Sequence, residues 1–163
     1  MLFKTSLDKT ARAITIIFTA LFISIIALLY MLRIPDNDAV SPMYIAIILL
    51  LLYCAAFAFH PSGYKITGDT LFICRPAGKV RIKRSDVKSA TVIDKKDISG
   101  AIRTFGVGGV FGYYGCFANY TLGSMTWYAT RKDKAVLITT TKNKKIVVTP
   151  DDPMAFIAAL MHS

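Results

Sequence analysis

The chain has 163 residues, of which 54% are apolar, and its 20 Lys and Arg residues against 10 Asp, with no Glu, give a net charge of +10. The high apolar fraction excludes a disordered chain, because disorder requires low hydrophobicity. This fraction is also above the value of about half or less that is usual for soluble domains, which disfavours a purely soluble enzyme.

Two uncharged apolar runs of twenty residues each occupy residues 13–32 and 40–59. A helix of this length is ~30 Å long, which matches the hydrocarbon core of a bilayer. Both runs are therefore predicted to be transmembrane helices, and the short polar turn at residues 33–38 makes them an antiparallel hairpin. Residues 1–62 are assigned to this membrane hairpin and residues 63–163 to a separate domain.

The distribution of Lys and Arg predicts the orientation of the hairpin. Basic residues precede the first run and follow the second, whereas the turn has Arg33 alone beside two Asp residues. Positive charge favours the cytoplasmic side, so both termini are expected in the cytoplasm of a bacterium, with the spans in its inner membrane. Neither run has an ionisable Lys, Arg, Asp, Glu or His, which favours an anchor over a transporter.

Two other interpretations of the runs were weighed. The first run resembles a signal peptide in its basic start, but it is longer than a usual signal core and no convincing cleavage site follows it. The two runs could also be a buried hairpin of a soluble protein, although two uncharged runs of twenty residues are hard to bury in so short a chain.

The region after the second run is predicted to be a cytoplasmic β domain closed by a C-terminal helix. Asp152 can cap that helix and Pro153 suits its first position. The fold class is therefore α+β, with a barrel or sandwich of about seven antiparallel strands. The strand-like runs are residues 64–67, 70–74, 79–83, 87–93, 125–130, 135–140 and 145–149.

Several short motifs resemble the small bacterial PH-domain proteins. They are Arg-Thr-Phe-Gly from Arg103, Phe-Gly-Tyr-Tyr-Gly from Phe111, Tyr-Ala-Thr from Tyr128, and the final VVTPDDPMAFIAAL. The resemblance covers residues 64–162 and implies a PH-like fold of two orthogonal antiparallel sheets with a helix closing one end. Many such proteins have a transmembrane pair before the domain, and the family implies no common reaction.

A glycine-rich segment with many aromatic residues is the most unusual part of the sequence. Seven of the ten glycines lie between Gly100 and Gly123. Nucleotide binding is disfavoured because neither a complete G-x-G-x-x-G nor a P-loop is present. The segment is interpreted either as a structural loop with aromatic rings packed beneath it, or as an exposed contact surface for lipid or a partner protein. The candidate contact residues of this segment are Phe111, Tyr113 and Tyr114.

Two basic clusters are further candidates for contact with a lipid or a partner. The first is Lys79, Arg81, Lys83 and Arg84, and the second is Lys142, Lys144 and Lys145. Near an anionic leaflet each basic residue contributes ~1 kcal/mol, so the clusters could recognise phospholipid headgroups. They could equally be a solvated basic face, and RNA binding is disfavoured because the aromatic residues lie on no recognisable RNA-binding strand.

The sequence contains no recognisable constellation for catalysis, metal binding or a cofactor. Cys54, Cys74 and Cys116 are scattered and odd in number. We therefore expect a membrane-anchored binding or scaffold module that acts through a protein partner or self-association, and no enzyme. Recognition of anionic lipid is the main alternative, and an accessory subunit of a membrane enzyme is the second.

Overall fold

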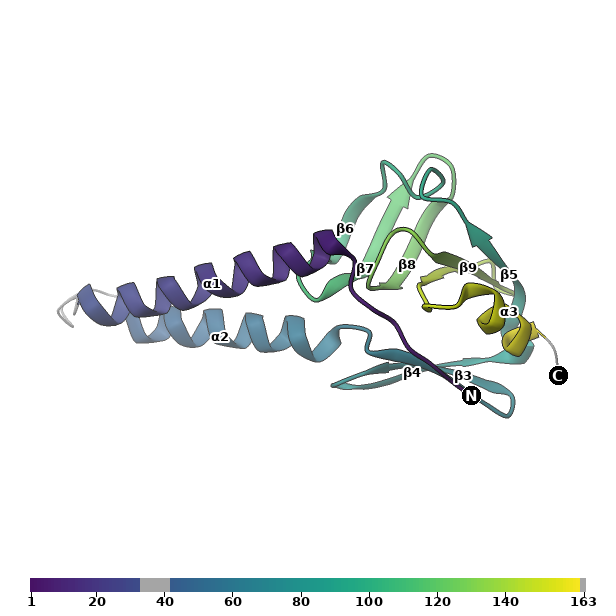
Figure 1. Cartoon of the computed structure of the whole chain (residues 1–163), viewed down its shortest axis with the longest axis horizontal. Coiled ribbons are helices and arrows are strands. Elements are labelled where there is room, and N and C mark those ends of the chain that lie inside the picture. The colour runs from purple at the N-terminus through teal and green to yellow at the C-terminus, as the bar shows by residue number, and fades with distance from the viewer. Residues whose placement is uncertain (33–41, 162–163) are drawn as a thin grey trace.

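The computed structural model describes residues 1–32 and 42–161. Two helices, α1 (Lys9–Leu32) and α2 (Pro42–Phe59), extend side by side away from a β domain on which the N-terminus also lies (Figure 1). The predicted turn at residues 33–38 and the start of the second predicted run lie outside the described residues.

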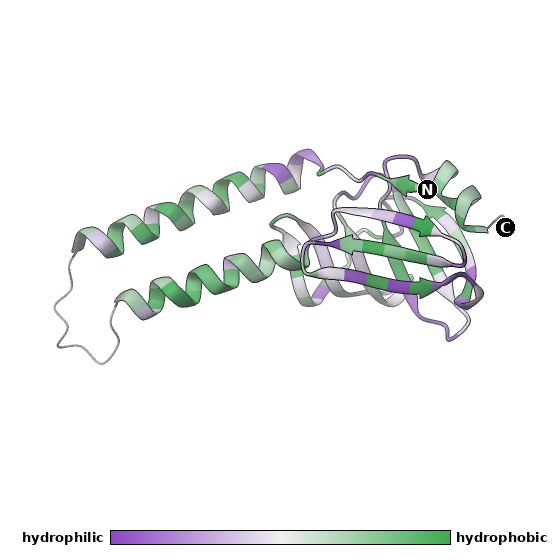
Figure 2. Ribbon diagram, turned by 90° about the horizontal axis from the view of Figure 1, so that it is seen from below, coloured by the Kyte–Doolittle hydropathy of each residue, from purple (hydrophilic) through white to green (hydrophobic). Residues whose placement is uncertain are grey.

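The two helices contact each other through a small number of side chains. The Oγ1 of Thr19 lies 2.9 Å from the hydroxyl of Tyr53, and Phe22 stacks on Tyr53 with ring centroids 4.9 Å apart. Most of the remaining apolar side chains are exposed, and both helices are hydrophobic along most of their length (Figure 2). Isolated helices with this exposure require another apolar phase or a partner to cover them.

By length and composition, α1 is the one helix within the described ranges that is long and apolar enough to cross a membrane. The apolar part of α2, Met43–Phe59, is shorter. By this criterion α1 alone indicates membrane association, and the second of the two predicted spans is not supported by it.

The β domain consists of two separate sheets. One sheet has four strands in the order β1-β2-β3-β4, and the other has six in the order β5-β9-β10-β8-β7-β6. A short 3₁₀ helix, η1 (Arg84–Asp86), connects the sheets, and α3 (Pro153–Met161) follows the last strand. The strands are β1 (Leu2–Phe3), β2 (Gly63–Thr67), β3 (Thr70–Arg75), β4 (Gly78–Lys83), β5 (Val87–Ile93), β6 (Ile102–Gly109), β7 (Gly112–Asn119), β8 (Gly123–Ala129), β9 (Ala135–Thr140) and β10 (Lys145–Val148).

The described residues form ten strands where about seven were predicted, and the two sheets form a sandwich and no closed barrel. The expectation that all strands are antiparallel is wrong for one pair, because β10 lies parallel to β8. The strands that the pattern missed are β1, which is very short, and the hairpin β6–β7. Glycine is depleted in strands and breaks the alternation of side chains, so the glycine segment resembled a loop. In the structure β6 and β7 pair over most of their length.

The main core lies between the two sheets and α3. Its largest side chains include Tyr64 and Phe156, both fully buried, whose ring centroids are 5.8 Å apart. The Tyr64 hydroxyl donates to the backbone oxygen of Tyr128 at 2.6 Å, which joins the two sheets across the core. A second cluster covers the opposite face of the six-stranded sheet around Trp127.

The first eight residues lie on the β domain before α1 begins. Leu2 and Phe3 pair with β2, and the Oγ1 of Thr5 donates to the carbonyl of Thr149 at 2.7 Å. Asp8 accepts a hydrogen bond from the backbone N–H of Ala11 at 2.6 Å and so caps the start of α1. The segment assigned to the membrane hairpin therefore contributes residues to the domain's own sheet.

Candidate functional site

The glycine-rich segment forms the junction between the helices and the β domain. Phe111, at the tip of the β6–β7 hairpin, makes edge contacts with Tyr53 and Phe57 of α2, with 5.4 Å between ring centroids in both cases. Its backbone N–H donates to the Oγ1 of Thr15 in α1 at 2.8 Å. The hairpin tip is therefore occupied by the chain's own helices.

Tyr113 and Tyr114 are buried, with exposed fractions of 2% and 6%. The hydroxyl of Tyr114 donates to the carbonyl of Ala56 in α2, and that of Tyr113 lies 3.4 Å from a carboxylate oxygen of Asp8. Burial, with the negative charge of Asp8, raises the pKa of Tyr113 to about 12. The interpretation of these two rings as exposed is thus not met. Neighbouring residues of a strand point to opposite faces, and Tyr113 packs in the cluster around Trp127 whereas Tyr114 contacts α2.

The glycines allow the two strands of this hairpin to approach closely. Gly106 and Gly115 face each other across the pair, with φ of 110° and 121°. A Cβ on Gly106 would overlap the Tyr114 carbonyl oxygen, and a Cβ on Gly115 would overlap that of Phe105. Of the interpretations drawn from the sequence, the structural one accounts for these glycines.

The first basic cluster lies on the outer face of the four-stranded sheet. Lys79, Arg81 and Lys83 of β4 are exposed, whereas Ile82 is buried in the core and Val80 is half-buried beside it. Arg81 also lies over the ring of Phe72 on the neighbouring strand, 6.0 Å from its centroid. The strand thus has a basic outer side and an apolar inner side.

A cavity of about 350 Å³ brings residues of both basic clusters together. It lies between β4 and the inner face of the six-stranded sheet, and we call it the basic groove. Lys142 and Lys144 line it together with Arg81, whose guanidinium lies over Phe72 on the outer side, and Asp86 has the single carboxylate of the lining. The remaining lining residues are Val80, Ile82, Thr126, Tyr128, Thr140, Thr141 and Ile146.

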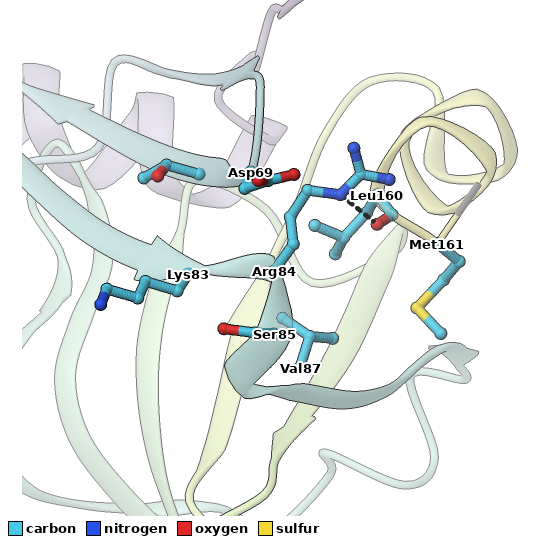
Figure 3. A pocket seen from close by; sticks show the side chains of 8 residues that line it. Asp69, Lys83, Arg84, Ser85, Val87, Leu160 and Met161 are labelled. Carbon is cyan, nitrogen blue, oxygen red and sulfur yellow. Dashed lines mark hydrogen bonds between the residues drawn. The ribbon is translucent and has the colours of Figure 1, made fainter. Parts of the chain in front are cut away.

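The other two candidate basic residues have structural partners. Lys145 donates to the carbonyl of Leu122. Arg84 points toward the end of α3 at the side of a second cavity of about 660 Å³ (Figure 3). Its Nε donates to the carbonyl of Leu160 at 3.0 Å, which ties the last turn of α3 to the end of β4. A cation at this position suits the unpaired carbonyls of a helix C-terminus.

Sequence reasoning missed the lining of the groove from the six-stranded sheet. The residues on the opposite face of these strands are mostly buried, and the missed lining residues are Thr126, Tyr128 and Ile146. The alternation along β8 does place Thr126 and Tyr128 on one face. The alternation cannot show that β4 leaves Thr126 and Tyr128 uncovered, because their exposure depends on how the two sheets diverge.

One end of the basic groove lies near the helices, because Tyr128 in its lining pairs with Tyr114, whose hydroxyl contacts α2. The turn between β3 and β4 contacts the end of α2, where the N–H of Ala77 donates to the carbonyl of Ala58 at 2.8 Å. From that turn β4 runs away from the helices, roughly along the long axis of the molecule (Figure 1). At ~3.3 Å per residue, Lys83 lies ~17 Å beyond Gly78 along the strand.

The described residues contain no group of three or more His, Cys or Asp side chains placed to hold a metal ion. Cys54, Cys74 and Cys116 are free thiols.

The basic groove combines a positive edge with an apolar lining, and it can bind a negatively charged group that has apolar parts.

The model of the bacterial PH domain matches residues 62–163, which is more than half of the chain. The chain belongs to the bacterial PH domain family. No curated protein and no solved structure matches it. Membership supports a binding or scaffold role for this bacterial PH domain, and both the hairpin β6–β7 and the basic groove lie within the matched region.

Proposed function

We propose that this chain is a bacterial PH domain held at the cytoplasmic face of the inner membrane by α1 and α2, where it binds an acidic protein partner through the basic groove. The observation that carries this proposal is the groove itself, whose lining brings residues of the two basic clusters together.

The exposed apolar surfaces of the helices support the membrane anchor. Ile17 of α1 and Leu51 of α2 are 67% and 63% exposed, and neither helix has a Lys, Arg, Asp, Glu or His from Ala13 onward within the described ranges. With 24 residues, α1 is ~36 Å long, and α2 with 18 residues is ~27 Å, close to the ~30 Å core of a bilayer. Both helices span the membrane in this proposal, so both ends of the chain lie on the same side.

Lipid recognition by the same clusters is the weaker alternative. If the membrane surface lies near the base of the helices, Arg81, the basic residue of β4 in the groove lining, is ~10 Å beyond Gly78 along the strand. The screening length at physiological ionic strength is ~8 Å, so the attraction of an anionic leaflet is reduced several-fold at that distance. A soluble segment of a protein reaches the groove without this loss. We further propose that the domain has no catalytic activity of its own.

The test is photocross-linking in intact membranes with the full chain. A photoreactive phenylalanine analogue at Lys142 or Thr141, beside the groove, should give a discrete protein adduct. The same analogue at Lys96 serves as the control, because the loop at residues 94–101 packs through Ile98 on the opposite face of the six-stranded sheet.

The adduct should disappear in the charge-reversal variant Lys144→Glu, and the cross-linked region of the partner should be acidic. Adducts that form only with lipid would contradict the proposal and support the lipid alternative. An adduct that is equally strong from Lys96 would show that the groove is not the binding surface.

A further inference from the structure

Strand β4 is an unpaired edge of the four-stranded sheet. Within the described residues it pairs with β3 alone. An antiparallel pair alternates between hydrogen-bonded and non-hydrogen-bonded residue pairs. The N–H of Arg84 donates to the carbonyl of Asp69 at 2.8 Å, one step beyond the pair Thr70–Lys83. This bond therefore shows that Arg84, and every second residue before it in β4, directs its backbone groups toward β3.

It follows that alternate residues of β4 turn their backbone N–H and C=O groups away from β3. They are Lys79, Arg81 and Lys83, the residues of the first basic cluster on this strand. An edge of this kind is a template for an additional strand. From the first to the last of these three residues is four residue steps, or ~13 Å, which is long enough to align a short peptide.

The two sides of this edge differ chemically. On the outer side are the exposed ends of Lys79, Arg81 and Lys83. On the inner side, Val80 and Ile82 face the basic groove together with Tyr128 and Ile146. Side chains of a strand added beside β4 would point alternately to these two environments. Negative charge is favoured on the outer side and apolar groups on the inner side.

We propose that the basic groove binds an extended segment of a partner protein as an additional strand along β4, and that acidic and apolar residues alternate in this segment. The inference rests on the proposed function and adds to it the conformation and chemistry of the partner. Main-chain hydrogen bonds supply affinity in this mode, and pockets for alternate side chains supply specificity.

The size and charge of the groove favour this occupant. A cavity of about 350 Å³ accommodates one or two apolar side chains but no helix. The exposed cations Lys79, Arg81 and Lys83 on the outer side of β4 suit acidic residues of the segment. The apolar residues of the segment would face Val80 and Ile82 in the groove.

The test measures peptide binding to the full chain in nanodiscs of neutral lipid. The probe is a fluorescent eight-residue peptide in which Asp and Val alternate, followed by fluorescence polarisation. One control peptide is N-methylated at alternate residues and cannot complete a strand ladder. A second has the same composition in two blocks, four Asp and then four Val.

We expect the alternating peptide to bind, and both control peptides to bind at least tenfold more weakly. Arg81→Glu should weaken binding of the alternating peptide by tenfold or more, whereas Lys96→Glu, an equal change of charge outside the groove, should leave it unchanged. Hydrogen exchange at the amides of Arg81 and Lys83 should slow when the peptide is bound.

Equal affinity for the N-methylated peptide would overturn the inference, because it would show that charge alone is recognised. Absence of peptide binding, with protein adducts still formed beside the groove, would also overturn it and would leave the proposed function standing. Loss of both the adducts and peptide binding would overturn the inference and the proposed function together.

Discussion

At the scale of single residues, Gly106 illustrates how a backbone contact determines residue type. Its φ of 110° is unfavourable for other residues, and a Cβ would overlap the Tyr114 carbonyl of the paired strand. We expect Gly106→Ala to lower the melting temperature strongly. Gly100 also has positive φ but open space around its Cβ position, so Gly100→Ala should cost only the ~1–2 kcal/mol of the left-handed conformation. Thermal unfolding in detergent compares the two, and equal losses would contradict the role of the close approach.

Tyr113 predicts a dependence of stability on alkaline pH. Its pKa is raised from 10.0 to about 12 by burial and by Asp8. The stabilisation is present below the unfolded pKa and is lost as pH rises through the folded value. The folded chain should therefore lose stability between pH 10 and 12. In Tyr113→Phe this loss should be smaller, which urea unfolding at pH 9 and pH 11.5 would measure. An unchanged pH dependence in the variant would contradict the assignment.

At the scale of elements, the hairpin β6–β7 connects the helices to the domain. Phe111 has a positive φ of 56°, a conformation that favours glycine, and it contacts rings of α2. Phe111→Gly relieves the backbone but removes the ring. We expect this variant to unfold at a lower temperature, because the lost contacts outweigh the relief. Tyr120→Gly, at a fully exposed ring, is the control and should change stability much less. A more stable Phe111→Gly variant would show that the junction contributes little.

At the scale of the whole molecule, the residues before α1 complete the β domain. Leu2 and Phe3 extend the four-stranded sheet, and Ser6 donates to Asp151 through its hydroxyl at 2.7 Å. Residues 60–163 alone should therefore be less stable than a variant in which a short Gly-Ser linker joins residues 1–12 to residues 57–163. Urea unfolding of the two would show the difference. Equal urea midpoints would mean that the N-terminal segment contacts the domain without stabilising it.

Much of the fold was predictable because its signals are local. The alternation along β4 correctly placed Ile82 in the core and its basic neighbours outside, and the Pro153 signal marked the first residue of α3. Short motifs also indicated the PH family before any contact was known. The hairpin β6–β7 was missed because its glycines are required by the close approach of the two backbones. That requirement leaves no periodic pattern in the sequence.

The candidate site was predicted only in part. The two basic clusters are visible in the sequence, but their meeting at one groove depends on the position of β4 beside the turn between β9 and β10. For Tyr113 and Tyr114 the sequence left a packed loop and an exposed contact surface open, and the structure buries both rings where the hairpin meets Asp8 and Ala56. A contact between segments about fifty or a hundred residues apart has no local signature.

The sequence by itself determined the apolar run of α1, the basic character of the domain, the family and most of the strands, because hydrophobicity, charge and alternation are properties of neighbouring residues. Only the tertiary structure decided which aromatic residues remain exposed, which cations are bonded to the chain and where the sheets diverge to leave an open groove. The physical reason is that burial and edge exposure depend on the packing of distant elements. The free edge of β4, on which the binding inference rests, exists because no other described strand reaches it.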